Sequence, residues 1–222
     1  MSTPDTVVLD VDGTLVDTVY HHTMAWARAF AEQGLDVPVW RMHRAIGMGG
    51  DKIVAHLTDD ATEERYGDRL RELHGRYFSE VIEQVAALPG ASRLVTALLE
   101  RGVKVALASS GEGDQTRQLL SEVEGVDRVD AFVTGSDVEQ TKPSPDLVQV
   151  AVEKAGGRTP VVVGDSVWDV TIAHEQGWPA VGLLCGGFGE GELTEAGAGL
   201  VVASPGDLAD RLDEVLGAQA RR

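Results

Sequence analysis

Short apolar segments alternate with segments of helical periodicity along most of this 222-residue chain. The apolar segments are almost continuously hydrophobic, which is typical of strands buried on both faces of a parallel sheet. The expected strands are Thr6–Leu9, Val103–Ala108, Val129–Thr134, Pro160–Val163, Ala180–Leu184 and Gly199–Val202. This alternation predicts an α/β fold with a parallel sheet, in which ligands bind beside the carboxyl ends of the strands.

A helical insert is expected directly after the first strand, because residues 18–86 lack the two-residue alternation of half-buried strands. Helical stretches are expected at His21–Gly34, Val39–Ala45, Gly50–Leu57 and Ala61–Ala86. Leu88-Pro89-Gly90 then interrupts regular structure. The sequence therefore predicts a core domain of residues 1–17 and 87–222 and a helical domain of residues 18–86.

The charge balance excludes some classes of partner. Lys and Arg total 19 against 36 Asp and Glu, which gives a net charge of −17. Such a chain is not expected to bind nucleic acid or an anionic membrane surface, since both require cationic side chains. The single cysteine, Cys185, permits no intrachain disulfide and fits a cytoplasmic setting. A monomer and a small homo-oligomer are equally compatible with the sequence.

The first expected strand ends in the segment Asp10-Val11-Asp12-Gly13-Thr14-Leu15. Alternate side chains of extended backbone point the same way, so Asp10 and Asp12 are expected to converge. Two converging carboxylates repel each other unless a cation or a shared proton intervenes. Mg²⁺ is the simplest candidate, because it prefers oxygen ligands. The alternative interpretation of a lone Asp-Gly is an ordinary turn.

Polar side chains also follow three other expected strands. Ser109 and Ser110 stand where a strand meets a helix, which suits either helix capping or phosphate binding. Lys142 precedes a proline, which biases its backbone towards an extended conformation. Asp165 ends a buried strand, and Asp169 lies at capping-box spacing in the helix that follows. These groups are expected at one edge of the sheet.

The ordered set Asp10-x-Asp12-Gly-Thr, Ser109, Lys142 and Gly164-Asp165-x-x-x-Asp169 resembles the four signatures of the haloacid dehalogenase-like (HAD) hydrolases. The resemblance spans residues 10–169 and implies a Rossmann-like, HAD-like parallel-sheet core. The helical insert resembles the small α-helical cap domain of the phosphatase and β-phosphoglucomutase-like branch of that family.

This resemblance implies a chemical role for each aspartate. Asp10 is expected to be the nucleophile that forms an aspartyl-phosphate, and Asp12 the general acid and base. Asp10, the backbone carbonyl of Asp12 and Asp165 are expected to hold Mg²⁺, with Asp169 orienting the metal's surroundings. The presence of Asp12 favours phosphoryl transfer, since the dehalogenases of the family lack this second aspartate.

Further residues are expected to bind the substrate. The predicted phosphate-binding residues are Ser109, Ser110 and Lys142. The predicted cap and hinge residues are Thr18, His22, Gly49 and Gly50. The expected activity is Mg²⁺-dependent hydrolysis of a small phosphorylated metabolite.

A sugar-phosphate mutase of the β-phosphoglucomutase type is the alternative activity. Thr18, His22 and Trp26 resemble residues of that enzyme's cap and hinge. The mutase's cap arginine, which grips a second phosphate, aligns near Gly50 in this chain. Three nearby cationic residues are candidates to replace it, namely Arg41, Arg44 and Lys52.

A dinucleotide-binding oxidoreductase is a remote alternative. Gly187-Phe188-Gly189-Glu190-Gly191 follows an expected strand, as a dinucleotide fingerprint does. Position 192, where the third glycine of the fingerprint is required, holds Glu192. This loop is therefore expected to have a structural role. A catalytically inactive binding protein is a further alternative.

Overall fold

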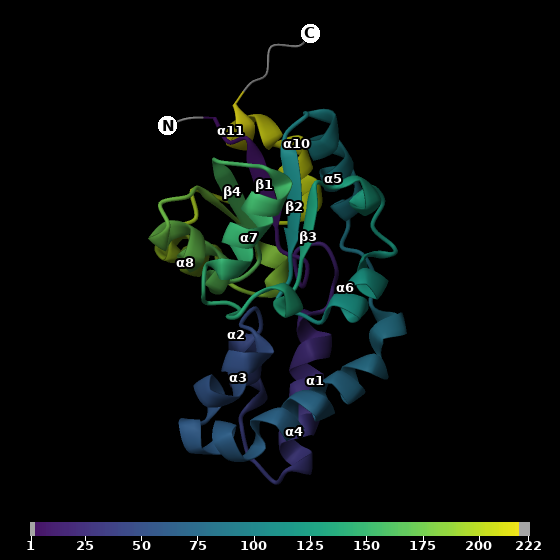
Figure 1. Cartoon of the computed structure of the whole chain (residues 1–222), viewed down its shortest axis with the longest axis vertical. Coiled ribbons are helices and arrows are strands. Elements are labelled where there is room, and N and C mark those ends of the chain that lie inside the picture. The colour runs from purple at the N-terminus through teal and green to yellow at the C-terminus, as the bar shows by residue number, and fades with distance from the viewer. Residues whose placement is uncertain (1–2, 218–222) are drawn as a thin grey trace.

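A computed structural model describes residues 3–217 and shows the predicted α/β fold (Figure 1). Six parallel strands form one sheet in the order β3-β2-β1-β4-β5-β6. The strands are β1 (Thr6–Leu9), β2 (Lys104–Ala108), β3 (Ala131–Val133), β4 (Pro160–Gly164), β5 (Ala180–Leu183) and β6 (Leu200–Val202). The predicted core domain also includes residues 1–2 and 218–222, which lie outside the described residues.

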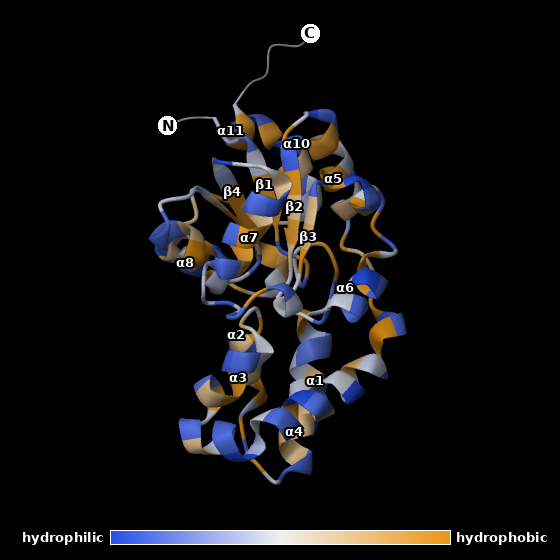
Figure 2. Cartoon of the chain, in the orientation of Figure 1, coloured by the Kyte–Doolittle hydropathy of each residue, from blue (hydrophilic) through white to orange (hydrophobic). Residues whose placement is uncertain are grey.

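Strand β1 lies at the centre of the sheet because all four of its side chains are buried. Leu9 pairs with Leu107 of β2 on one side and with Val163 of β4 on the other. The three strands therefore end at the same edge of the sheet, which brings the segments that follow them together. Figure 2 shows that hydrophobic residues are concentrated in the strands.

Helices cover both faces of the sheet. One apolar cluster joins Val7 and Leu9 to side chains of α5, α6, α10 and α11, and the other joins Val8 to side chains of α7, α8 and α9. The helices are α5 (Ala91–Glu100), α6 (Gly113–Leu120), α7 (Asp146–Ala155), α8 (Val167–Glu175), α9 (Glu190–Ala196), α10 (Pro205–Asp210) and α11 (Leu212–Leu216). The short 3₁₀ helices are η1 (Ile82–Gln84), η2 (Val126–Arg128), η3 (Gly135–Asp137) and η4 (Leu184–Gly186).

The insert after β1 is helical, as predicted, and lies beyond the carboxyl edge of the sheet (Figure 1). Its helices are α1 (Val19–Glu32), α2 (Val39–Ala45), α3 (Gly50–Leu57) and α4 (Asp60–Ser79). Twelve buried side chains, including Trp26, Phe30 and Leu73, form an apolar cluster within the insert. The proposed domain boundaries near residues 18 and 86 stay predictions.

The expectation of one helix over Ala61–Ala86 was wrong. Helix α4 ends at Ser79, and η1 follows after a short turn. The reason is packing: Ile82 is buried in the apolar cluster of α5, α10 and α11, and Val81 and Val85 pack against it. A straight continuation of α4 does not deliver these side chains to the sheet.

Among residues 3–217, no helix combines the length and the apolar character required to cross a membrane.

Asp5 fastens the beginning of β1 to the segment that leads into β4. Its carboxylate accepts hydrogen bonds from the backbone N–H groups of Arg158 (3.0 Å) and Thr159 (2.9 Å) and from the hydroxyl of Thr6 (2.7 Å). Partial burial raises the pKa of this carboxyl, but the hydrogen bonds from Thr6, Thr159 and Arg158 outweigh that effect and lower it to about 2.

We therefore expect Asp5→Asn to lower the free energy of unfolding by about 1 kcal/mol at pH 7, a modest value because the group is exposed. The pKa is depressed on folding, so the contribution is complete above the unfolded pKa of 3.8 and disappears as the pH falls towards 2. Urea titrations of both proteins at pH 7 and pH 3 measure the difference. A difference that grows at pH 3 contradicts this account.

Candidate active site

Four connections at the carboxyl edge of the sheet supply the predicted polar side chains. Asp10 follows β1, Ser109 follows β2, Lys142 lies in the loop after β3, and Asp165 follows β4. Their exposed fractions are 6%, 0%, 2% and 4%, which is unusual for such polar groups. Buried charges need partners, so the contacts among these residues determine what the site does.

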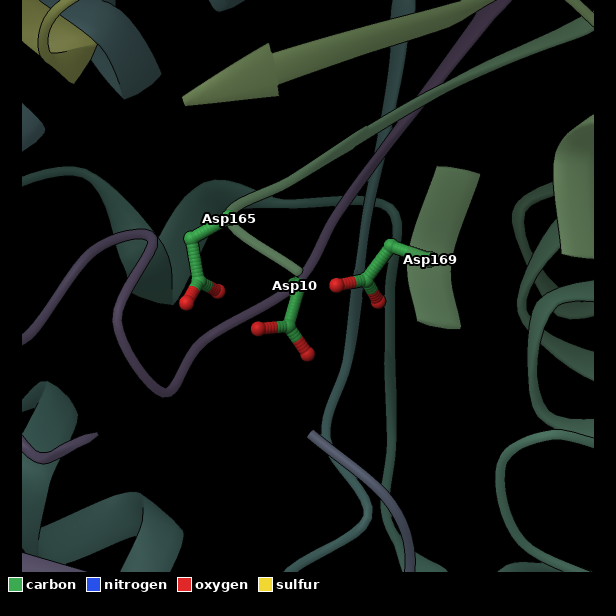
Figure 3. A group of neighbouring side chains, drawn as sticks. All are labelled: Asp10, Asp165 and Asp169. Atoms are coloured by element: carbon green, nitrogen blue, oxygen red, sulfur yellow. The ribbon is translucent and has the colours of Figure 1, made fainter. Parts of the chain in front are cut away.

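Asp10, Asp165 and Asp169 form a buried carboxylate cluster, which Figure 3 shows. Each offers an oxygen that lies within 4.8 Å of the others. Burial raises the pKa of Asp10 to about 7, although Lys142 opposes that shift. Burial, followed by the charges of Asp10 and Asp169, raises the pKa of Asp165 well above its usual value. A nearby positive charge would therefore stabilise the ionised form of these carboxylates.

Lys142 supplies part of that charge. Its Nζ donates a hydrogen bond to Asp10 Oδ1 and forms an ion pair with Asp169 Oδ1 at 2.6 Å. Burial lowers the pKa of this ammonium, but Asp10 and Asp169 outweigh that effect and hold it well above its usual value. The backbone N–H of Gly49 also donates to the Lys142 carbonyl at 3.0 Å. The lysine is therefore held in place, as its position before a proline suggested, and its two carboxylate partners favour the charged form.

The cluster fits a hard divalent cation. If all three carboxylates are ionised, the single ammonium of Lys142 leaves two negative charges (3 − 1 = 2) uncompensated. All three side chains offer oxygen, the ligand atom that Mg²⁺ prefers. Thr14 Oγ1 donates to Asp165 Oδ1 at 3.1 Å and orients that carboxylate. Gly13 has a left-handed backbone (φ 78°), and a side chain there would collide with Asp165.

Asp169 combines a structural contact with its place in the cluster. Ser166 caps α8, and its hydroxyl donates to Asp169 Oδ2 at 2.6 Å. The backbone N–H of Asp169 returns a hydrogen bond to Ser166 Oγ at 3.4 Å. The predicted capping-box spacing is therefore an actual capping box, and the other oxygen of Asp169 remains directed at Lys142.

The side chain of Asp12 has a different set of partners. Its Oδ1 accepts from Thr18 Oγ1 at 2.9 Å and lies 3.2 Å from His22 Nε2, while its Oδ2 accepts from Ser109 Oγ at 3.0 Å. Burial raises the pKa of this carboxyl, but the contacts with His22, Thr18 and Ser109 lower it to about 2. The structure does not bring this carboxylate into the cluster of Asp10, so only its backbone carbonyl stays a predicted metal ligand.

Asp12 also accounts for the contacts of Thr18 and His22 at the start of the insert. Thr18 begins α1 without a side-chain capping bond, because its hydroxyl is directed at Asp12 instead. His22 also touches His74 of α4, with its Nδ1 3.1 Å from His74 Nε2. Burial and the neighbouring His22 lower the pKa of His74 well below its usual value. The structure thus places the two predicted residues Thr18 and His22 at the site. It also places His74 there, which the sequence analysis did not predict.

The two predicted serines differ. Ser109 Oγ donates to Asp12 and accepts from the backbone N–H of Gly111 at 3.0 Å. Ser110 Oγ is buried and has no hydrogen-bond partner among the described residues. Ser110 is one of the residues that line the cavity beside Asp10, and its buried hydroxyl lacks a partner that a bound ligand could supply.

A cavity of about 460 Å³ lies between the insert and the core, at the carboxyl edge of the sheet. The core contributes Asp10, Asp12, Ser110 and Lys142 to its lining. The insert contributes His22, Trp26, Ile46, Gly47, Met48, Gly50, Ile53, Arg71, Glu72, His74 and Gly75. Its size and its mixture of apolar and polar walls are typical of a site for a small molecule.

Gly50 lines this cavity, and Gly49 precedes Gly50 in the chain. A side chain at Gly49 would collide with Thr141, whose hydroxyl contacts Asp51. This close approach explains why position 49 is a glycine, at the point where the insert meets the loop that contains Lys142. At Gly50 the nearest side chain is that of Arg71, which donates from Nη1 to the Gly50 carbonyl at 3.2 Å.

Three cationic residues were suggested from the sequence as replacements for the cap arginine of the mutases. Arg41, Arg44 and Lys52 do not line the cavity within the described part of the chain. Arg44 instead pairs with Glu192 of α9. Arg71 is the arginine that the structure places beside Gly50, and no local pattern distinguished it, because it lies 21 residues further along the chain.

The loop at Gly187 packs against the insert. Gly187 has a left-handed backbone (φ 86°), and a side chain there would press on His43. His43 Nε2 also lies 3.0 Å from the carbonyl of Gly186, and its ring is stacked on Tyr20. These contacts support the expected structural role of the loop.

The comparisons with known proteins agree with this architecture. A family model described as haloacid dehalogenase-like hydrolase matches residues 4–177, and a second HAD-like hydrolase model matches residues 140–215. The chain therefore belongs to the haloacid dehalogenase-like hydrolases. The predicted family, fold class and hydrolase assignment are confirmed.

Individual relatives show which members of the family this chain resembles. A phosphoglycolate phosphatase from Yersinia pseudotuberculosis is 30% identical over 201 residues, which cover 85% of this chain and 84% of the relative. The crystal structure of a hydrolase from Pseudomonas syringae is 35% identical, with a TM-score of 0.89 over 95% of this chain and 98% of that chain. A putative β-phosphoglucomutase from Bacteroides vulgatus is 20% identical, with a TM-score of 0.85 over 97% of this chain and 91% of that chain, and shows the shared fold alone.

Proposed function

We propose that this chain is a Mg²⁺-dependent phosphatase that hydrolyses a small phosphorylated metabolite through an aspartyl-phosphate on Asp10. The observation that carries the proposal is the cavity that Asp10, Asp12, Ser110 and Lys142 line together. The similarity to phosphoglycolate phosphatases supports it. We place the enzyme in the cytoplasm, as its single cysteine suggests.

Asp10 is the nucleophile in this proposal. One of its carboxylate oxygens attacks phosphorus, a bond to the phosphoryl group forms, and the bond from phosphorus to the leaving oxygen breaks. Lys142 and Ser110 bind the phosphoryl oxygens and stabilise the negative charge on those oxygens in the transition state. Asp10, Asp165 and the backbone carbonyl of Asp12 would hold Mg²⁺, which would offset the repulsion between the attacking carboxylate and the phosphate.

Asp12 moves the proton. An anionic phosphate in the cavity raises the pKa of this carboxyl, so that it enters the reaction protonated and gives its proton to the leaving oxygen. It then accepts a proton from the water that attacks the aspartyl-phosphate, and inorganic phosphate departs as Asp10 is regenerated. The hydrogen bonds from Thr18 and Ser109 favour the ionised, proton-accepting form of Asp12.

The insert acts as a cap in this proposal. Helices α1 and α4 supply one wall of the cavity, through His22 and His74. The segment that bears Gly49 contacts the lysine loop directly. Opening of the cap admits substrate, and closure limits the access of other water molecules.

The metal requirement gives a first test. We expect the protein to release p-nitrophenol from p-nitrophenyl phosphate with Mg²⁺, and to lose at least about 90% of that rate in excess EDTA because the repulsion within the carboxylate cluster returns. Added Mg²⁺ restores the rate. A rate that is unchanged by EDTA contradicts the metal assignment, and a panel of phosphorylated metabolites then ranks the substrates, with phosphoglycolate first.

A sugar-phosphate mutase is the second candidate, and the position of Arg71 favours it. A second cation on the wall opposite the core could hold the second phosphate of a bisphosphate intermediate. Glucose 1-phosphate with a catalytic amount of glucose 1,6-bisphosphate separates the activities. A mutase forms glucose 6-phosphate, whereas a phosphatase releases inorganic phosphate.

A further inference from the structure

We infer that Arg71 selects substrates that carry a second anionic group, which its guanidinium binds at the end of the cavity away from Asp10. This inference rests on the proposed function, since it concerns the substrate of the same site. Arg71 is on α4, a cap helix that the sequence signatures do not include (Figure 1).

Few cationic groups are available in this cavity. Among the residues that the structure describes, Lys142 and Arg71 are the lysine and arginine side chains that line it. Lys142 is engaged by Asp10 and Asp169, at the phosphate end. Because the whole chain carries a net charge of −17, a second anionic group on a substrate needs a local cation. Arg71 is the residue in position to provide it.

The guanidinium of Arg71 is held in place by contacts that leave some of its N–H donors available. Its Nη1 donates to the Gly50 carbonyl at 3.2 Å and pairs with Glu63 at 2.8 Å, and its Nη2 pairs with Asp68 at 2.9 Å. A guanidinium has five N–H donors, so these three contacts leave at least two for a ligand. A planar, pre-oriented group of this kind suits a carboxylate or a phosphate.

The acidic partners of Arg71 do not neutralise it equally. The side chain of Asp68 is fully exposed, and water screens such a pair strongly. Glu63 is about one-quarter exposed, and its second oxygen is buried without a partner. Glu63 therefore acts as the fixed support of the guanidinium, whereas Asp68 is free to move away when a ligand arrives.

The location of Arg71 also favours contact with substrate. Arg71, Gly50 and Ser110 line the main cavity and also a second, adjoining cavity of about 280 Å³ that is more open. Ser110 and Arg71 thus border the same space. One small molecule with an anionic group at each end can engage both sides of this space.

The test compares three phosphomonoesters that differ only at the far end. Phosphoglycolate ends in a carboxylate, 2-hydroxyethyl phosphate in a neutral hydroxyl, and phosphoethanolamine in an ammonium. We expect Arg71→Ala to lower kcat/KM for phosphoglycolate by about 10- to 100-fold, the usual weight of a charge-assisted hydrogen bond. For the hydroxyl compound we expect a change smaller than about 3-fold, because that compound has no charge for Arg71 to bind.

Matched variants separate recognition from structure. Arg69→Ala removes a neighbouring arginine of α4 that pairs with Glu32 and Glu72 and does not line the cavity, and it should leave all three rates unchanged. Arg71→Lys should restore part of the preference for phosphoglycolate. Asp68→Asn should not weaken binding of phosphoglycolate. Equal losses on all three compounds in Arg71→Ala would overturn the inference and indicate a structural role.

Binding in the absence of turnover distinguishes this inference from the proposed function. In an Asp10→Asn background, calorimetry should show that phosphoglycolate binds more tightly than 2-hydroxyethyl phosphate, and that Arg71→Ala removes the difference. If the wild-type protein hydrolyses none of the compounds but keeps this preference, the phosphatase proposal fails and the role of Arg71 stands. If glucose 1,6-bisphosphate alone shows a dependence on Arg71, the second anion is a phosphate. Equal affinity for the charged and neutral compounds overturns the role of Arg71 in either case.

Discussion

Replacing Asp10 with Asn is expected to lower the turnover of every phosphomonoester by a factor on the order of 10⁴ or more, as loss of a covalent nucleophile does in other hydrolases. The amide has nearly the same shape but is a poor nucleophile, so neither the aspartyl-phosphate nor its hydrolysis remains. The rate of p-nitrophenyl phosphate hydrolysis in excess Mg²⁺ measures the effect. Trapping of radiolabelled phosphate on the denatured protein should succeed for the wild type and fail for the variant.

Folding is not expected to limit the Asp10→Asn protein. The substitution removes one of three crowded carboxylates, and Lys142 retains its ion pair with Asp169. Its unfolding midpoint in urea should therefore equal or exceed that of the wild type. Asp17→Asn is the matched control, since Asp17 is an exposed aspartate in the same loop and should keep full activity. Substantial phosphatase activity in the Asp10→Asn protein would show that another group is the nucleophile.

The sheet could be predicted from sequence because each strand carries its own signal. Thr6–Leu9 is almost continuously apolar, and Asp165 directly follows β4. Both the strands and the edge where they end can therefore be recognised in the sequence. Parallel pairing then requires that the groups after β1, β2 and β4 meet. The end of α4 was missed because burial of Ile82 against the core, rather than local helical preference, decides where that helix stops.

The part of the site that the insert contributes could be predicted less fully from the sequence. His74 and Arg71 are among many polar residues of α4, and their spacing resembles that of an ordinary solvated helix face. Only the packing of α1 and α3 against α4 shows that His74 reaches His22 and that Arg71 reaches Gly50. A helical pattern identifies which faces are apolar, but it does not specify which neighbour a polar face will meet.

Replacing Lys142 with Met is expected to be the most damaging single change to stability within the site. Loss of one member of a buried ion pair costs about 3–5 kcal/mol, because the remaining charge is left unpaired. Here both Asp10 and Asp169 lose their cationic partner at once, in a cluster whose burial already disfavours ionisation. Urea titration in EDTA should show a lower midpoint with an unchanged slope. Lys154→Met, which removes an exposed ion pair with Asp137, is the matched control and should cost less than about 1 kcal/mol.

Mg²⁺ should separate the structural task of Lys142 from its catalytic task. Without the ammonium the cluster is more negative, so the cation is expected to bind more tightly and to recover part of the lost stability, by about 2.7 kcal/mol at a concentration 100 times its Kd. Turnover should not recover, since the cation does not replace the donor that holds the phosphoryl oxygens. Recovery of both stability and turnover would mean that Lys142 acts only as a counter-charge. If Mg²⁺ stabilises neither protein, the conclusion would be that the carboxylate cluster does not bind this cation.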